Sequence, residues 1–552
     1  MLLGAPGLGG RGLASSSEEE SSFARGWRAW LVASLLFAPV GWLYAAHALG
    51  APPGYGPTGF IQYDQLYYMA NARELLDRGG LTYGNPFSPE YATAAIYFQP
   101  ILLLLAAALR LTGADPGLIY VAFGAVSAIA CLRVVIGLYR AQVALTDRAA
   151  WLGLVLFAWG GGLLALAGFY RSWLAGGSDP LAFDPAGGWW FLNLGRNLVY
   201  PTEAFHHLLF FGAILLALRA RWGWAAALAT LLSASHPFTG IELLGILFGW
   251  SALERLVLRN REVPLWFVGA MLALLALHAG YYLGLLNTDP EHRALFEQWR
   301  VFDAVLEWPT IVLAYGLAAL FAGVAIARAP SFRAAFAERR NRLFAVWLLG
   351  AFALANNDLV IDPIQPLHFT RGYVWTPLFL LGAPVLVGTL REFLARPGVR
   401  GKALATSLSA VLLFDNAAWF AIHTQKPPGL WLTRDERALF AWLKRPDNRG
   451  AVILASPRLA YAATAYTPLR GWYTHRYNTP HAQRRAHELA GVFATGRLPA
   501  STEPTTFLLV HDRARSRNPR VLPQGRKSEL VYRSATITVW RVAAPGPARP
   551  HT

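Results

Sequence analysis

Asp64 stands at the start of a predicted amphipathic helix and is the first candidate for chemistry. From Asp64 to Arg78 the apolar and polar residues follow a helical period, which Gly79 and Gly80 end. First-turn amides favour an anionic carboxylate at this position. If partly desolvated, the carboxylate is a candidate general base for a hydroxyl group. The alternative interpretation is a helix cap.

Two arginines are candidates for binding a phosphate group. Arg371 ends the segment NNDLVIDPIQPLHFTRG, and Arg196 lies in NLGRNLVYPTEAFHH. A guanidinium keeps its charge and can donate two parallel hydrogen bonds to phosphate oxygens. Either side chain could instead extend from the edge of a membrane into water, and both interpretations stay open.

The other candidate substrate-binding residues are Tyr68, Glu203, His236 and His368. Glu203 is a candidate second acid, whereas Asp179 and Asp184 precede prolines and are typical of turns. His206 and His207 are adjacent, so their side chains point apart and form a poor pair of metal ligands. The sequence predicts no defined metal site, and a divalent metal stays an open alternative.

The composition is that of an integral membrane protein. Of 552 residues, 55% are hydrophobic and 15% are charged, whereas soluble domains have about 25% charged residues. The single cysteine, Cys131, excludes a disulfide framework and a thiolate metal site. The net charge of +17 is concentrated in 424–552, which holds 21 Lys and Arg against 7 Asp and Glu. Nucleic acid is therefore a poor explanation of the charge.

Eleven apolar segments are predicted to span the membrane: 27–49, 117–139, 149–170, 204–220, 223–236, 238–258, 264–286, 308–328, 343–356, 373–393 and 403–423. Arginine clusters occupy every second connection, which places those connections in the cytoplasm. This alternation requires 97–111 to lie on the outer surface as a juxtamembrane helix. The N-terminus is then cytoplasmic and the C-terminus outside. Residues 1–26 are predicted to be a disordered leader.

The transmembrane domain is predicted at 27–423, with a large outer loop at 50–116. Residues 424–552 are predicted to form an extracytoplasmic α/β domain after a linker at 427–429. Its strands are expected at 451–456, 506–510 and 531–542, and its helices at 435–444 and 481–495. The fold class is thus an all-α polytopic membrane bundle, with juxtamembrane helices and a C-terminal soluble α/β domain.

The stretch YDQLYYMANARELLDRGG and the tail segment YTPLRGWYTHRYNTPHAQRRAHELAGVFATGRLP resemble the GT-C superfamily of membrane glycosyltransferases, in an uncharacterised bacterial branch. The order of the predicted elements is also similar to that of the superfamily. A first span is followed by an acidic outer loop, a juxtamembrane helix, many further spans and an outer tail. The resemblance implies that Asp64 is the catalytic acid, that the donor is a polyprenyl-phosphate-linked sugar, and that configuration inverts. Many members have paired acids in the first loop. Here Tyr63 and Gln65 flank a single Asp64.

The predicted function is transfer of a hexose or pentose from a polyprenyl-phosphate donor to a glycan, lipid or protein acceptor outside the cytoplasm. The predicted location is the bacterial plasma membrane, in contact with membrane lipids. One alternative is an O-antigen ligase or polymerase that relies on outer Arg and His residues instead of Asp64. Another is a flippase or transporter of lipid-linked glycans, which predicts acids or helix breaks at mid-span in paired halves.

Overall fold

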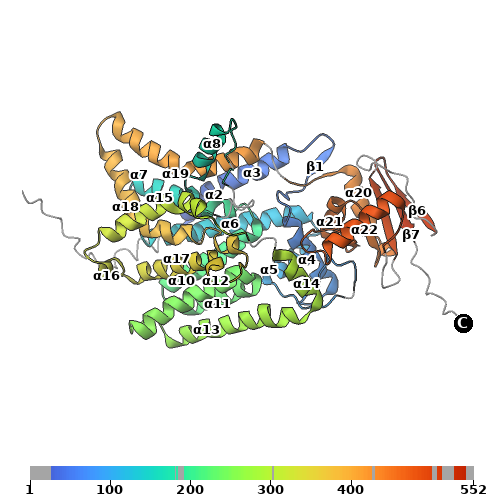
Figure 1. The fold of residues 1–552 in the computed structure, drawn as a ribbon, viewed down its shortest axis with the longest axis horizontal. Helices are drawn as coiled ribbons and strands as arrows, with labels where there is room; N and C mark the ends of the chain where they lie inside the picture. Colours follow the sequence, from blue (N-terminus) through green and yellow to red (C-terminus); the bar gives the residue numbers. More distant parts are fainter. Residues whose placement is uncertain are drawn as a thin grey trace, which may run out of the picture.

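The computed structural model describes residues 26–91, 93–180, 182–183, 192–300, 304–425, 429–499, 506–512 and 527–542. These residues form a long helical bundle with a small sheet at one end, which we call the sheet end (Figure 1). Nearly all of the predicted leader, Asp184, and residues 427 and 428 of the predicted linker lie outside the described residues. The predicted domain boundaries stay predictions.

The bundle consists of α2 (Trp27–Leu36), α3 (Ala38–Leu49), α6 (Pro116–Arg140), α7 (Arg148–Trp159), α8 (Leu164–Leu174), α10 (Pro201–Leu218), α11 (Trp222–Ser235), α12 (Pro237–Ala252), α13 (Leu265–Ala279), α15 (Trp308–Ala327), α17 (Arg339–Ala355), α18 (Trp375–Ala395) and α19 (Val399–Gln425). Helices α4 (Gln65–Arg78), α5 (Pro100–Thr112) and α14 (Pro290–Trp299) lie toward the sheet end (Figure 1). The short α16 (Phe332–Ala335) lies at the opposite end.

Six described helical segments are long and apolar enough to cross a membrane: α6, α10, α13 with its following turns, α15, α18 and α19. The bent pairs α2–α3 and α7–α8 raise this number to eight if each pair is one span. The chain is therefore a multi-pass membrane protein.

The remaining predicted spans coincide with α11, α12 and α17, which have 14, 16 and 17 residues. The total of eleven stays a prediction, because these helices fall short of the roughly 20 residues that span a bilayer.

Helix α5 occupies the segment that was predicted to lie on the membrane surface. It has 13 residues, which at 1.5 Å per residue give a length of about 20 Å. The hydrocarbon core is about 30 Å thick, so a helix of this length does not cross it.

The break between α7 and α8 falls at Gly160, Gly161 and Gly162, and the two helices meet at 63°. Asp415 of α19 accepts hydrogen bonds from the backbone N–H groups of Leu164 (3.4 Å) and Ala165 (2.8 Å). These bonds satisfy amides at the start of α8 that the break leaves without intrahelical partners. The buried carboxyl of Asp415 thus stabilises the start of α8.

The sheet end contains a five-stranded sheet in the order β4-β3-β5-β7-β6. The strands are β3 (Val452–Leu454), β4 (Arg470–Gly471), β5 (Phe507–Asp512), β6 (Ser528–Arg533) and β7 (Ile537–Val542). β3 is parallel to β4 and β5, and β7 is antiparallel to β5 and β6. The accompanying helices are α20 (Arg434–Leu443), α21 (Pro457–Tyr466) and α22 (Ala482–Thr495). The predicted strands and helices are all present.

Helix α21 was not predicted, because every residue from Leu459 to Tyr466 is buried and no polar face marks it as a helix.

The predicted outer loop and the C-terminal segment form one structure. Strand β1 (Tyr55–Pro57) of the loop pairs antiparallel with β2 (Trp431–Thr433). Next to this pair, the backbone N–H of Leu430 donates to the carbonyl oxygen of Phe60 at 2.8 Å. The residues around Asp64 are thereby held against the C-terminal segment.

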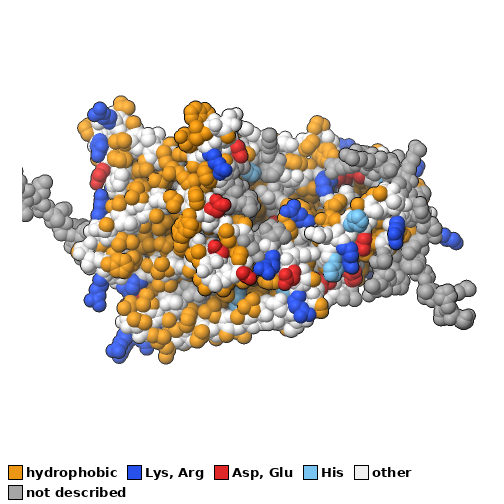
Figure 2. All heavy atoms as spheres, viewed as in Figure 1, with side chains coloured by type: hydrophobic (Ala, Val, Ile, Leu, Met, Phe, Trp, Pro, Cys, Tyr) orange, Lys and Arg blue, Asp and Glu red, His pale blue; other side chains and the backbone are white. Residues whose placement is uncertain are grey.

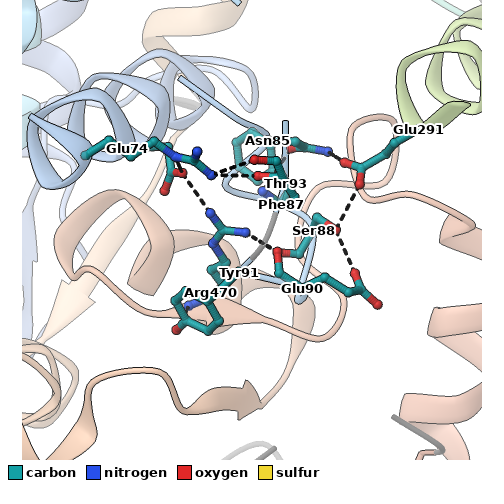
Figure 3. Close-up of polar contacts among 10 residues, drawn as sticks. Glu74, Asn85, Phe87, Ser88, Glu90, Tyr91, Thr93, Glu291 and Arg470 are labelled. Atoms are coloured by element: carbon teal, nitrogen blue, oxygen red, sulfur yellow. Dashed lines mark hydrogen bonds and ion pairs between the residues drawn. The ribbon is translucent and has the colours of Figure 1, made fainter. Parts of the chain in front are cut away.

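A polar network makes a second connection between the same parts (Figure 3). Arg470 of β4 donates from Nη2 to Glu74 of α4 at 2.7 Å and from Nη1 to the carbonyl oxygen of Ser88 at 3.3 Å. Asn85 Nδ2 donates to Glu291 of α14 at 2.9 Å. The Ser88 hydroxyl donates to Glu90 at 2.7 Å and lies 3.3 Å from Glu291 Oε2. The network therefore joins α4, α14 and the sheet.

Glu291 makes this network sensitive to pH. Burial and the neighbouring Asp289 and Glu90 charges raise the pKa of Glu291 from its usual 4.5, although the Asn85 hydrogen bond opposes them. A raised native pKa means that protonated Glu291 favours the folded state, and that this stabilisation is lost as the pH rises through the native pKa. Protonated Glu291 can donate to Ser88 Oγ, whose own hydrogen points to Glu90.

We therefore expect Glu291→Gln, which supplies the same donor at every pH, to raise the thermal unfolding midpoint relative to wild type above pH 6. The difference should vanish toward pH 4. The exposed acid on the same helix provides the control, Glu297→Gln, which should leave the pH profile unchanged. A constant difference between Glu291→Gln and wild type at all pH values would contradict this prediction.

Candidate active site

A cavity of about 370 Å³ lies where the starts of α4, α10 and α12, the loop before α18 and residues 475–478 meet. We call it the central cavity. Six of the seven predicted site residues line it: Asp64, Tyr68, Glu203, His236, His368 and Arg371. These six residues come from four separate parts of the sequence and converge on one site.

Asp64 occupies the N-cap position of α4, but its side chain makes no capping hydrogen bond. The neighbouring Gln65 bonds to the preceding turn instead, since its Oε1 accepts from the backbone N–H of Ile61 at 2.8 Å. The Asp64 carboxylate is 65% exposed and lines the central cavity. The interpretation of Asp64 as a simple helix cap is therefore wrong.

His475 hydrogen-bonds to Asp64 and was not among the predicted site residues. Its Nε2 lies 3.1 Å from Asp64 Oδ1, and its side chain is 2% exposed. Its Nδ1 accepts from the backbone N–H groups of Tyr477 (3.1 Å) and Asn478 (3.2 Å). Because these bonds occupy the Nδ1 lone pair, the neutral ring carries its proton on Nε2 and donates it to the carboxylate. His475 therefore orients the Asp64 carboxylate.

Tyr63, which precedes Asp64, supports this arrangement. Its ring lies 4.9 Å from the ring of His475, and its hydroxyl accepts from the backbone N–H of Arg476 at 3.1 Å. Burial raises the pKa of Tyr63 to about 12, so the hydroxyl stays protonated. A tyrosine thus takes a structural role beside the single acid.

Arg371 and Glu203 form a buried ion pair in the wall of the central cavity. Glu203 is in the first turn of α10, and Arg371 precedes α18. His207 holds the backbone of Arg371, since its Nε2 lies 2.6 Å from the Arg371 carbonyl oxygen. His207 thus bonds to the loop that carries Arg371. A buried pair with this support places the guanidinium at a fixed position.

Glu203, His206 and His236 are the one group in the described residues whose ligand atoms lie close enough to hold a metal, within 4.8 Å of one another. Glu203 Oε2 and both ring nitrogens of His206 have no hydrogen-bond partner in the described part of the chain. His236 Nδ1, however, accepts from the backbone N–H of Thr239 at 3.1 Å. Its neutral ring then carries the proton on Nε2 and offers no second lone pair.

This donor set fits a divalent cation poorly. A catalytic zinc site needs three protein ligands, whereas here one imidazole is a donor and Glu203 is already paired with Arg371. The donors that line the cavity suit an anion better than a metal ion.

Aromatic side chains supply much of the remaining wall. Tyr67, Tyr68, Tyr120, Tyr200, Trp299 and Tyr477 line the central cavity. Tyr68 and Tyr120 stack with their ring centroids 6.2 Å apart, and burial raises the pKa of the Tyr68 hydroxyl above its usual range. Its O–H therefore remains a donor. A pocket that combines aromatic walls with fixed polar groups is typical of a site for an organic ligand.

Arg196, the seventh predicted residue, is not part of the central cavity. It lies in the short helix α9 (Leu194–Asn197), is fully buried, and interacts electrostatically with Asp415. Asp179 is exposed and does not line the cavity either. The two arginines that look equivalent in the sequence therefore occupy different environments.

No family model matches the chain, and no curated protein matches it. Solved structures similar to it include the Archaeoglobus fulgidus oligosaccharyltransferase in the apo form, with 12% identity, a TM-score of 0.48, and coverage of 89% of this chain and 70% of that chain. ArnT from Cupriavidus metallidurans bound to undecaprenyl phosphate has 14% identity, a TM-score of 0.46, and coverage of 93% and 98%. Its apo state has 13% identity, a TM-score of 0.47, and coverage of 93% and 97%.

The bond from His475 to Asp64 predicts a measurable coupling between the two side chains. We expect His475→Phe and Asp64→Ala each to lower the free energy of unfolding, and the double variant to lower it by about 0.5 to 1.5 kcal/mol less than the sum of the two. His475→Gln keeps a donor and should lower it less than His475→Phe. The exposed His487→Phe is the control. Strictly additive effects of His475→Phe and Asp64→Ala would refute the assignment.

The poor metal fit predicts that the purified protein contains no stoichiometric zinc or manganese. Elemental analysis should find well under one equivalent of either metal, and a chelator should leave the unfolding midpoint unchanged. If the protein instead binds one equivalent of either metal, and His206→Asn abolishes this binding, the assignment of His236 as a hydrogen-bond donor is wrong.

Proposed function

We propose that the protein is a membrane glycosyltransferase that moves a sugar from a polyprenyl-phosphate donor to an acceptor hydroxyl. One observation carries this proposal: Asp64, oriented by His475, and Arg371, fixed by Glu203, line the same cavity at one end of a membrane bundle. A base and a guanidinium facing one aromatic pocket supply the groups that such a transfer needs.

In the proposed reaction the acceptor oxygen attacks the anomeric carbon of the donor sugar. Asp64 takes the proton of the acceptor hydroxyl. The bond between the anomeric carbon and the phosphate oxygen breaks, and its electron pair leaves with the lipid phosphate. Arg371, His236 Nε2–H and the Tyr68 hydroxyl are the proposed donors to that phosphate. A single displacement inverts the configuration.

A second cavity supports access for a lipid donor. It has a volume of about 370 Å³, lies between α14 and residues 361–365, and shares Trp299 and Gln365 with the central cavity. Beside it the apolar side chains of Leu359, Val360 and Ile361 are exposed, Val360 by 87%. Exposed apolar loops at the end of a membrane bundle are suited to contact lipid. We propose that the prenyl chain passes here.

The charge distribution supports an extracytoplasmic site. Figure 2 shows Lys and Arg side chains at both ends of this face, with few acids among them at the left end, opposite the sheet. The connection around α16 at that end holds Arg333, Arg339 and Arg340. Short basic connections face the cytoplasm. The sheet end and the central cavity would then lie outside, with the N-terminus in the cytoplasm of a bacterial cell.

The test is sugar transfer by the purified protein in nanodiscs, with a panel of polyprenyl-phosphate-linked hexoses and pentoses and with release of polyprenyl phosphate as the readout. We expect Asp64→Asn to lower turnover by about 10²- to 10⁴-fold, the usual contribution of a general base. Asp179→Asn removes an exposed acid and should match wild type.

The same experiment separates the alternatives. Transfer that survives in Asp64→Asn but is lost in Arg371→Gln would favour the ligase or polymerase mechanism. Absence of release with every donor, from protein whose unfolding transition is intact, would overturn the proposed function.

A further inference from the structure

A separate cavity of about 410 Å³ lies between α4, the end of α5, the start of α6 and α20. We call it the basic cavity, and it shares no lining residue with the central cavity. Its lining is Arg73, Leu76, Leu109, Gly113, Ala114, Asp115, Pro116, Arg437, Phe440, Ala441, Lys444 and Tyr466. The sequence analysis assigned it no role.

The cations of the basic cavity outnumber its acids. Asp115 is its one carboxylate, and both oxygens of that group are occupied. Oδ2 accepts from Arg437 Nη1 at 3.0 Å, and Oδ1 accepts from the Tyr466 hydroxyl at 3.1 Å. Arg437 is thereby neutralised, and two further cations, Arg73 and Lys444, remain in the lining.

Neither remaining cation is paired with an acid in the lining. Arg73 donates one hydrogen bond, from Nε to the carbonyl oxygen of Ala465 at 3.1 Å, and interacts electrostatically with Asp77, one turn further along α4 and outside the lining. In the described residues Lys444 Nζ has no hydrogen bond or ion pair. Desolvation and the Arg73 guanidinium lower the pKa of Lys444, and the Asp115 carboxylate opposes them. Arg73 and Lys444, which line the same cavity, therefore repel each other.

The position of the basic cavity relates it to the membrane. Its lining includes Pro116, the first residue of the candidate span α6. Leu111 and Leu118, on either side of the lining residues 113–116, are 84% and 62% exposed. Leu76, Leu109 and Phe440 give the cavity an apolar floor. Positive charge above an apolar surface, at the end of a span, matches the charged head and acyl chains of a lipid.

We propose that the basic cavity binds the phosphate of an anionic phospholipid, whose acyl chains lie against the start of α6. The phosphate would neutralise the positive charges of Arg73 on α4 and Lys444 next to α20. The repulsion between α4 and the end of α20 would then be removed. Because α4 also carries Asp64 at its start, the lipid would help to hold the C-terminal segment over the central cavity. The proposal does not depend on the reaction catalysed there.

The experiment is thermal unfolding of the full chain in neutral detergent with added phosphatidylglycerol, phosphatidylcholine or soluble glycerol 3-phosphate. We expect phosphatidylglycerol to raise the wild-type midpoint by about 3 °C or more, by preferential binding to the folded state. Phosphatidylcholine and glycerol 3-phosphate should have little effect. Arg73→Gln and Lys444→Gln should each lose at least half of the shift, and Lys444→Arg should keep it.

Arg445→Gln is the matched control, because it removes an equal charge from the next residue outside the cavity, and it should respond as wild type does. Native mass spectrometry of the same samples provides a second readout. Wild type should retain one phosphatidylglycerol, and Arg73→Gln and Lys444→Gln should lose it. Equal loss in Arg445→Gln would indicate unspecific charge attraction and overturn the proposal. An equal shift with glycerol 3-phosphate would identify a soluble-phosphate site and overturn the lipid assignment.

Discussion

The hydrogen bond between His475 and Asp64 is the interaction on which the candidate site depends. It joins residues that lie 411 positions apart, and it forms only because β1 pairs with β2 and Arg470 bonds to Glu74. Each of these contacts connects the loop after α3 with the C-terminal segment. Their common effect is that the acid of the membrane domain is oriented by an imidazole from the sheet end. The C-terminal segment is therefore part of the site and not an appended module.

The need to pair buried polar groups explains two further features of the bundle. A polar group inside a membrane bundle that lacks a partner costs several kcal/mol. Asp415 accepts hydrogen bonds from amides at the start of α8, and Glu203 forms an ion pair with Arg371. The same reasoning identifies His236 and His475 as donors through Nε2, since each uses Nδ1 as an acceptor for backbone N–H groups. His475 donates to Asp64. The Nε2–H group of His236 and the Arg371 guanidinium, which line the same cavity, suit an anion better than a metal ion.

Several features were predictable because they depend on local pattern. Apolar runs marked the helices of the bundle, and alternating or continuous apolar residues marked β3, β5 and the β6–β7 hairpin. Asp64 stood out as the acid that opens an amphipathic helix, and Arg371 as an arginine just before an apolar segment, and the structure brings them to one cavity. Arg196 stood out for the same reason, but it packs near Asp415. Local pattern identifies a charge as unusual without showing whether its partner is a ligand or another buried group.

The sequence alone determined that the chain crosses a membrane, which segments are helical, and that a lone carboxylate opens an amphipathic helix at one end of the bundle. These properties follow from hydrophobic runs and periodicities within some 20 residues. Only the tertiary structure decided that Asp64 faces a cavity instead of capping its helix, that His475 orients it, and which arginine accompanies it. Such contacts depend on how distant segments pack, and no local spacing encodes the pairing of residues 411 positions apart.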